Sequence, residues 1–463
     1  MIGLFWALEP VLLGCLLVCR FSDLAAIRPA WVRLLLIFGA GAAGGIGLTS
    51  CLFFIFGVLL GSLVAAMVLE LALLAWVAFG VYRRPIPVFQ SGEDAGRPLL
   101  FPVAAGSLLL ALALAASTAW NGWAANPHGN WDAWAIWNLR ARFLAAHAGV
   151  AQRAWSPVLG AITHAEYPLL LSSFVGRCWA FGHSFTTLVP AVTGWIFFQA
   201  LIALAAGGVA VLRGPTLGVL VALVLASTPS LLHEVPSQYA DVPLACYFAG
   251  ALVLALLRRP VLAGIFAGFA AWTKDEGLLF LAVFLAATAV FRRRDALAAI
   301  AGALPAAAIA TFFKVALSRG NGYLLSMSVP GAAHRFAIMG RYETVIAAFG
   351  RGLLDMAQGW YHPILSLIVL AAALRFARER RREVAFSGAI GATLLLGYFG
   401  VYILTPLDLT WQLQTSLDRL LVQVWPVLVL TAFIGLRPPE AAVTVEPVPI
   451  QKVSKKAGRK SRR

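Results

Sequence analysis

Several of the side chains that could do chemistry in this chain stand at the ends of long apolar runs. Asp132 follows one such run and lies among the tryptophans of residues 131–137, and Asp241 stands two positions before Pro243 at the start of another. Asp132 is either a charge that stabilises a helix start or a carboxylate base at a membrane surface. Asp241 is either a helix N-cap or part of a substrate site.

Three consecutive ionisable residues, Lys274, Asp275 and Glu276, interrupt the apolar stretch 261–291. Charges at membrane depth are costly, and they usually face a cavity or pair with one another. The run is therefore either a structural Lys–Asp pair or a functional site in which Lys274 binds a phosphate as a point charge. The intramembrane position favours function.

Two further polar groups adjoin apolar runs. His164, Glu166 and Tyr167 precede Pro168 where the chain re-enters an apolar stretch, and they either cap a helix at the interface or line a substrate site. They are too few to define a metal site by themselves. Arg419, next to an aspartate at the start of the last apolar run, either anchors a helix end or meets an anionic lipid headgroup.

The composition indicates that membrane-spanning helices position these residues. Hydrophobic residues make up 61% of the 463 positions and charged residues 12%, whereas a soluble domain carries about 25% charged residues. We therefore predict an all-α polytopic bundle of about 11–13 spans, since a helical span needs about 20 apolar residues. The runs lie near 1–19, 33–56, 58–81, 99–120, 185–212, 215–231, 241–257, 261–291 (two short spans), 296–316, 359–376, 384–404 and 419–436.

The net charge of +16 comes from short basic clusters between these runs. Such clusters follow the positive-inside rule, which favours topology over nucleic-acid binding and predicts a cytoplasmic C-terminus. Residues 121–184 then form the largest outside loop. The glycine run 39–47 has no preceding strand and no Lys-Ser/Thr, so it predicts close helix packing and not a phosphate loop.

Taken in order, the motifs resemble those of the GT-C class of polytopic glycosyltransferases. This class includes bacterial relatives of the dolichyl-phosphate-mannose protein mannosyltransferases and the aminoarabinose lipid A transferases. The resemblance covers roughly residues 99–436, with residues 1–98 as additional N-terminal helices and 437–463 as a basic, disordered cytoplasmic tail. The matching pieces are Trp131-Asp132, Glu166-Tyr167-Pro168, Ala240-Asp241-Val242-Pro243, Thr273-Lys274-Asp275-Glu276-Gly277 and Asp418-Arg419 through Trp425-Pro426.

The resemblance implies a polyprenyl-phosphate-linked sugar donor, an inverting reaction at the outer surface of a bacterial inner membrane, and a lipid, glycan or protein acceptor. It makes Asp132 the general base. Lys274 and Arg419, with Arg341 as a further candidate, would hold the donor phosphate. His164, Glu166, Tyr167, Asp241, Asp275 and Glu276 would line the site.

The chain also departs from the family pattern. Ala133 follows Asp132 where many relatives carry a second acidic residue. This departure argues against a two-carboxylate or metal-dependent reaction, although a divalent metal is a possible cofactor. The reaction requires no nucleotide, and the sequence contains no nucleotide motif.

Two other functions fit part of the pattern. A lipid or solute transporter or flippase of envelope polysaccharide assembly would also carry intramembrane charges, and it predicts paired broken spans in the two halves of the chain. A non-catalytic assembly scaffold would not need the charges at 274–276.

Overall fold

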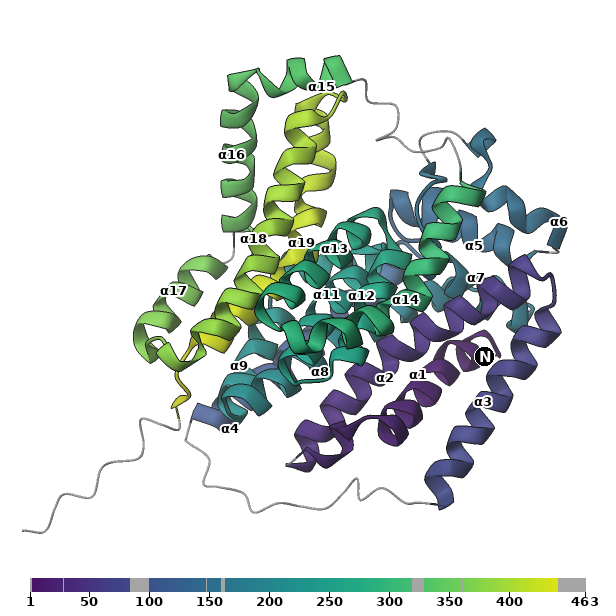
Figure 1. Cartoon of the computed structure of the whole chain (residues 1–463), viewed down its shortest axis with the longest axis horizontal. Coiled ribbons are helices and arrows are strands. Elements are labelled where there is room, and N and C mark those ends of the chain that lie inside the picture. Colours follow the sequence, from purple (N-terminus) through teal and green to yellow (C-terminus); the bar gives the residue numbers. More distant parts are fainter. Residues whose placement is uncertain are drawn as a thin grey trace, which may run out of the picture.

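The computed structural model describes residues 2–27, 29–83, 100–146, 148–159, 163–318, 329–359 and 362–439. Within these ranges the fold is all-α, as expected, and its one extended contact is a bridge between Phe376 and Leu436. The basic tail predicted at 437–463 lies almost entirely outside the described residues. Figure 1 shows the helices packed side by side, with α15 to α19 gathered at one side of the molecule.

Eight helices in the described ranges are long and apolar enough to cross a membrane, so the chain is a multi-pass membrane protein. A bent pair, α9 and α10, turns by 62° at its break and would make a ninth span. The eight are α1 (Ile2–Phe21), α2 (Ala30–Leu52, continued by Phe53–Leu59), α3 (Leu63–Arg83), α4 (Leu100–Ala125), α8 (Leu188–Arg213), α14 (Ala296–Phe312, continued by Phe313–Leu317), α18 (Arg381–Leu404) and α19 (Leu409–Gly435).

Shorter helices coincide with the remaining predicted runs. They are α9 (Pro215–Ala226), α11 (Asp241–Leu256), α12 (Pro260–Thr273), α13 (Asp275–Phe291) and α17 (Pro363–Leu374). Helix α10 (Pro229–Ser237) lies mostly beyond the run predicted to end at 231. Outside these runs, α15 (Val329–Phe336) and α16 (Met339–Leu354) form an amphipathic pair, and α16 packs against α18 and α19.

The last span starts earlier than its apolar run suggests. The hydropathy pattern predicts a start near residue 419, but α19 begins at Leu409. The carboxylate of Asp408 accepts the backbone N–H of Trp411 at 2.7 Å, which satisfies one of the free donors of the first turn. This early start places Arg419 inside α19, well beyond its first turn.

The large loop is mostly helical. It contains α5 (Asn138–Ala145), the short α6 (Ala148–Ala151) and α7 (Leu170–Gly182). Every residue of α7 is buried, because this helix packs against α1, α2 and α5. The loop is therefore anchored in the helical body, and we call the end of the molecule that carries residues 126–146, 148–159, 163–169 and 405–408 the loop face.

A buried ion group ties α7 to the N-terminal helices. The guanidinium of Arg177 lies 2.6 Å from a carboxylate oxygen of Glu9 on α1 and donates from Nε to Glu70 on α3 at 2.7 Å. It also donates to the carbonyl of Trp6 at 2.6 Å. All three ionic side chains are 0–1% exposed. Because each charge is buried, none of the three is stable there without the others.

Helices α1 and α2 approach closely through glycines. A Cβ built on Gly45 would lie 1.8 Å from the carbonyl oxygen of Pro10, and one built on Gly41 would lie 2.5 Å from the backbone nitrogen of Cys15. Only glycine fits at such contacts. The glycine run 39–47 therefore serves helix packing, as the sequence indicated.

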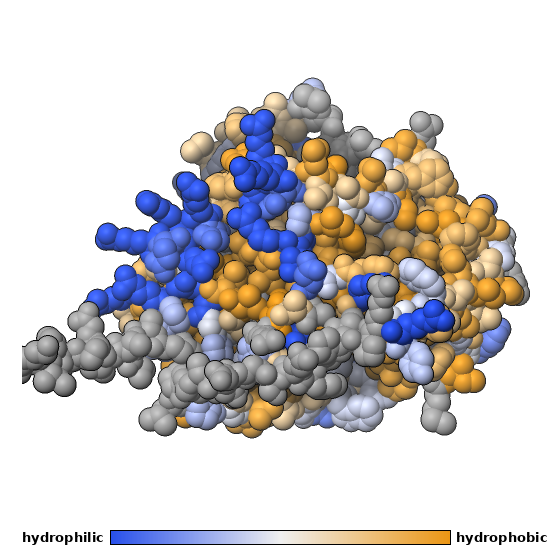
Figure 2. Space-filling view, turned by 60° about the horizontal axis from the view of Figure 1, so that its bottom comes forward, coloured by the Kyte–Doolittle hydropathy of each residue, from blue (hydrophilic) through white to orange (hydrophobic). Residues whose placement is uncertain are grey.

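Arginines gather at the opposite end of the molecule, which we call the basic face and define by the turns at 258–259, 292–295 and 375–380. Arg258 pairs with Asp295 at 3.3 Å, and Arg259 lies 3.5 Å from Asp23. Figure 2 brings this end forward and shows hydrophilic side chains gathered at one side of it. In α3 and α4 only 17% of the most apolar stretch is buried, so their outer surfaces suit contact with lipid.

Candidate functional site

Charged side chains from four separate segments meet at the loop face. Arg419 places Nη2 2.6 Å from Asp132 and donates from Nε to Asp241 at 3.1 Å. Lys274 lies 3.0 Å from both Asp241 and Glu276. We call these five residues (Asp132, Asp241, Lys274, Glu276 and Arg419) the ion-pair cluster.

Asp241 is the buried centre of the ion-pair cluster. Its carboxylate is fully buried at the first residue of α11 and accepts from Lys274, Arg419 and Gln423, the last at 2.5 Å. Gln423 stands one turn after Arg419 on α19, and its amide oxygen accepts the hydroxyl of Tyr398 at 2.8 Å. A buried carboxylate needs such donors in place of water.

Tyr239 orients Arg419 and Asp132 together. The Arg419 guanidinium lies 4.5 Å from the centre of the Tyr239 ring, a distance typical of cation–π contact. The Tyr239 hydroxyl accepts the backbone N–H of Asp132 at 3.3 Å. Burial raises the pKa of Tyr239 to about 12, so its hydroxyl stays neutral at physiological pH.

The segment before Asp132 is pinned to the turn after α10. Asn130 donates its backbone N–H to the carbonyl of Ser237 at 3.2 Å, and the amide of Gln238 donates to the carbonyl of Pro127 at 3.0 Å. Asn138 donates to the Gln238 side chain at 2.9 Å. These bonds fix the position from which Asp132 reaches Arg419.

The polar break predicted in 261–291 is confirmed. Helix α12 ends at Thr273, Lys274 is extended with φ −159° and ψ 163°, and α13 begins at Asp275. Gly277 makes the break possible, since a Cβ there would lie 1.8 Å from the carbonyl oxygen of Ala270. The break turns the Lys274 side chain towards Asp241.

A second polar group lies beside the ion-pair cluster. The His164 ring stacks on Tyr167 with 4.5 Å between centroids, and its Nδ1 lies 3.1 Å from Glu166. Burial alone would raise the pKa of Glu166, but the hydrogen bond and charge of His164 outweigh it and hold that pKa below its usual value. Lys274 lies 5.9 Å from the centre of the Tyr167 ring, so Tyr167 joins the two groups.

The predicted site residues divide into three sets. Asp132, Asp241, Lys274, Glu276 and Arg419 form the cluster itself, and His164, Glu166 and Tyr167 adjoin it. Asp275 turns away from Asp241 and lies 2.5 Å from Lys314. The structure does not bring Arg341 to the cluster, because its guanidinium donates to the carbonyls of Tyr402, Ile403 and Thr405 at the end of α18.

Some residues of the site were not predicted. Gln423, Lys314 and Tyr239 make the contacts described above. Glu234 on α10 is buried and lies within electrostatic range of Asp132, Asp241, Lys274 and Arg419. Lys314 is a charged residue within the apolar run 296–316, so the signal that identified Lys274 could also have found it, whereas Glu234 lies beyond the run 215–231 and carried no such signal.

The exposed members of the ion-pair cluster define what it can do. The side chains of Asp132 and Arg419 are each 17% exposed and that of Glu276 is 18% exposed, whereas Lys274 is 4% exposed and Asp241 is fully buried. A ligand at the loop face therefore meets two carboxylates and a guanidinium first, with a lysine charge behind them. Such a set can accept a proton and bind an anionic group.

Among the described residues, no group of three or more His, Cys, Asp or Glu side chains is placed to hold a metal ion. Comparison of the chain with protein-family models, with curated proteins and with solved structures gave no match.

Proposed function

We propose that the chain is a membrane glycosyltransferase that moves a sugar from a polyprenyl-phosphate-linked donor to an acceptor hydroxyl. The observation that carries this proposal is the convergence of Asp132, Asp241, Lys274 and Arg419 from four distant segments onto one partly exposed cluster. A base next to fixed cations is the arrangement that hydroxyl attack and phosphate departure require. The sequence resemblance to GT-C enzymes supports the same assignment.

In the proposed reaction Asp132 takes the proton of the acceptor hydroxyl. The hydroxyl oxygen bonds to the anomeric carbon as the bond from that carbon to the phosphate oxygen breaks, which inverts the carbon. The phosphate leaves with the bonding electron pair, and Arg419 and the Lys274 charge stabilise it. Preorganised cations at developing negative charge are usually the largest single contribution to such catalysis.

The donor phosphate must compete with Asp132 for Arg419. The 2.6 Å contact between the two side chains occupies both the proposed base and the proposed phosphate ligand. A phosphate that takes the guanidinium leaves the Asp132 carboxylate without its cation and free to accept a proton. Donor binding would thus prepare the base.

We propose a bacterial inner-membrane location with the loop face outside and the basic face in the cytoplasm, because arginine-rich turns mark cytoplasmic ends. The polyprenyl chain of the donor would lie among membrane lipids, and the acceptor would approach from the loop face. The acceptor is a lipid, a glycan or a protein. No nucleic-acid partner is expected.

A transporter or flippase is the second candidate, and one observation favours it. The 62° bend between α9 and α10 is a second broken span besides the break at Lys274. Both breaks adjoin one set of charges, because Glu234 on α10 lies within electrostatic range of Lys274. The two breaks therefore lie beside one site. In transporters the paired breaks line a pathway built from two repeats, so this arrangement fits a transporter less well than a single reaction site.

Mass spectrometry of lipids that co-purify with the full-length protein tests the main proposal. The wild type and the Asp132→Asn variant are extracted from the same membranes, with Asp408→Asn as the control, since Asn also caps helices. We expect a polyprenyl-phosphate sugar enriched on Asp132→Asn, and transfer activity only in the wild type and control. Full transfer by Asp132→Asn would remove the proposed base.

A further inference from the structure

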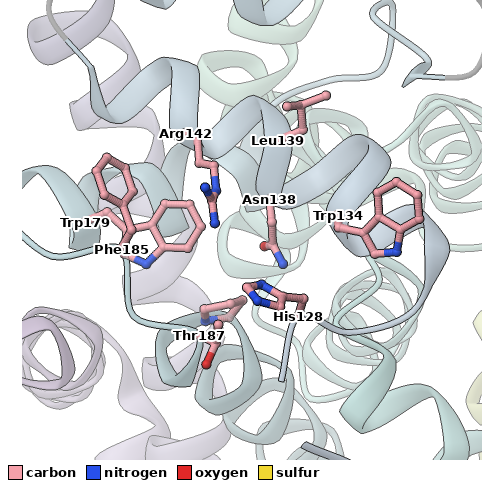
Figure 3. Close-up of a pocket in the computed structure, with 9 residues that line it drawn as sticks. His128, Trp134, Asn138, Leu139, Arg142, Trp179, Phe185 and Thr187 are labelled. Carbon is pink, nitrogen blue, oxygen red and sulfur yellow. The ribbon is translucent and has the colours of Figure 1, made fainter. Parts of the chain in front are cut away.

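A cleft of about 220 Å³ opens at the loop face (Figure 3). Its walls come from the turn after α4, from the helical segment 133–145, from α7 and from the start of α8. The residues that line it are His128, Trp134, Asn138, Leu139, Arg142, Trp179, Phe185, Thr187 and Pro190.

Arg142 supplies a cation to this cleft. Its guanidinium lies 6.0 Å from the Trp179 ring and 5.9 Å from the Phe185 ring, and Figure 3 shows it pointing into the cleft. Among the described residues no carboxylate lies within ion-pair distance of it. None of the described side chains that line the cleft is acidic. The cleft therefore favours an anionic ligand.

The opposite side of the cleft is polar. His128 and Thr187 lie across from Arg142, and Asn138 points between them (Figure 3). Asn138 is held in place by its hydrogen bond to Gln238. Fixed hydrogen-bonding groups of this kind among aromatic walls are typical of sites for small polar ligands.

The cleft neighbours the ion-pair cluster. A closed depression with no room for a ligand shares Asn138 and Pro190 with the cleft and reaches Tyr239. Tyr239 in turn contacts both Asp132 and Arg419. A ligand bound against Arg142 would therefore lie near the proposed base, separated from it by Asn138 and Tyr239.

We propose that this cleft binds an anionic sugar of the acceptor, with Arg142 pairing to its acidic group. A sugar ring offers C–H groups to the exposed aromatic face of Phe185, which carries partial negative charge, and hydroxyls to Asn138 and Thr187. A carboxylate on the ring matches the two-pronged guanidinium. This inference rests on the proposed glycosyltransferase function and names the class of its acceptor.

Saturation-transfer NMR on the full-length protein in detergent tests the proposal. The probes are methyl glucuronoside and methyl glucoside, which differ in the carboxylate, and inorganic phosphate serves as a competitor. The variants are Arg142→Ala and, as a matched control, Arg153→Ala, which removes an exposed arginine from the same loop. Thermal unfolding of each variant confirms that it is folded.

We expect the glucuronoside to bind the wild type and Arg153→Ala, and to bind Arg142→Ala about ten- to hundredfold more weakly, as for loss of a charge-assisted hydrogen bond. The glucoside should bind all three proteins equally weakly. Equal binding of the two sugars to the wild type would overturn the anionic assignment. Complete displacement by phosphate at the same concentration as the glucuronoside would show an anion site and overturn the sugar assignment.

This measurement is independent of transfer. Loss of glucuronoside binding in Arg142→Ala, together with absence of any polyprenyl-phosphate sugar on the protein, would keep the sugar cleft and reject the glycosyltransferase. A donor lipid on the protein, without selective glucuronoside binding, would support the glycosyltransferase and reject the sugar cleft.

Discussion

Arg419 and Asp132 form a 2.6 Å ion pair that joins α19 to the segment just after α4. The two residues are the proposed phosphate ligand and the proposed base, so each occupies the other until a substrate arrives. Asp241 holds the same guanidinium from its buried side at 3.1 Å. Of the two carboxylates that hold Arg419, Asp132 is the exposed one, so it is the one that a donor phosphate can replace.

Replacing Asp132 with Asn should have opposite effects on binding and on transfer. Transfer should be lost because an amide cannot take the acceptor proton. Donor binding should tighten by about tenfold, on the order of 1.4 kcal/mol, because the phosphate no longer competes with a carboxylate for Arg419. Titration of a polyprenyl-phosphate ligand against the purified variants measures this. Weaker binding by Asp132→Asn than by Asp408→Asn would contradict the competition.

Lys274→Met should weaken donor binding less than a substitution of Arg419 would, because Lys274 is nearly buried and already faces two carboxylates. We expect a several-fold loss of affinity and a lower melting temperature, because Asp241 loses one of its three donors. The double variant Asp241→Asn/Lys274→Met should recover melting temperature but not donor affinity. Unchanged donor affinity in both variants would assign Lys274 a purely structural part.

Arg419→Lys should impair sugar transfer although it keeps the positive charge. A lysine is a point charge and cannot hold Asp132 and Asp241 with the two edges of a planar group, nor stack as well on Tyr239. We expect kcat/KM to fall by at least about a hundredfold, roughly 2.7 kcal/mol, as when one preorganised transition-state donor is removed. Near-normal kcat/KM would show that charge alone suffices at this position.

Arg177→Met should destabilise the N-terminal half without touching the proposed site. It leaves Glu9 and Glu70 buried without their cation, which costs about 3–5 kcal/mol for a broken buried pair. Thermal unfolding in a fixed detergent measures the loss. The triple variant Glu9→Gln/Glu70→Gln/Arg177→Met should be more stable than Arg177→Met. An unchanged melting temperature in the single variant would show that the ion group does not hold these helices together.

The contact between His164 and Glu166 should make stability depend on pH. The pKa of Glu166 is lowered in the folded protein, so its contribution is present above its ordinary pKa of about 4.3 and is lost as the pH falls through the folded value. The melting temperature of the wild type should therefore fall more steeply below about pH 5 than that of Glu166→Gln. Parallel curves of melting temperature against pH for the two proteins would show that the contact between His164 and Glu166 does not contribute to stability.

The sequence was most informative where a charge interrupts an apolar run. The cost of burying Lys274 predicted a partner, but the aspartate that pairs with it is Asp241 from another span end, and not Asp275 within the same run. Helix positions also followed from hydropathy, because lipid requires continuous helices. The early start of α19 was missed, since Asp408 caps a first turn that is not apolar.

Contacts that depend on tertiary position could not be predicted in the same way. Arg341 is a cation near the loop face, but its guanidinium caps backbone carbonyls of α18, and no sequence pattern distinguishes that use from phosphate binding. Glu9, Glu70 and Arg177 are single charges in different segments. Intramembrane cost marks each as unusual, but only the packing of α7 against α1 shows that they belong together.

The ion group of Arg177 also has a consequence for how the protein is made. Residues 9 and 70 leave the ribosome before residue 177, so both carboxylates enter the bilayer while their cation has not yet been synthesised. The first three helices are therefore poorly suited to release into lipid when each is complete. Their final packing must await the segment that contains α7, which links the assembly of the N-terminal helices to the arrival of the large loop.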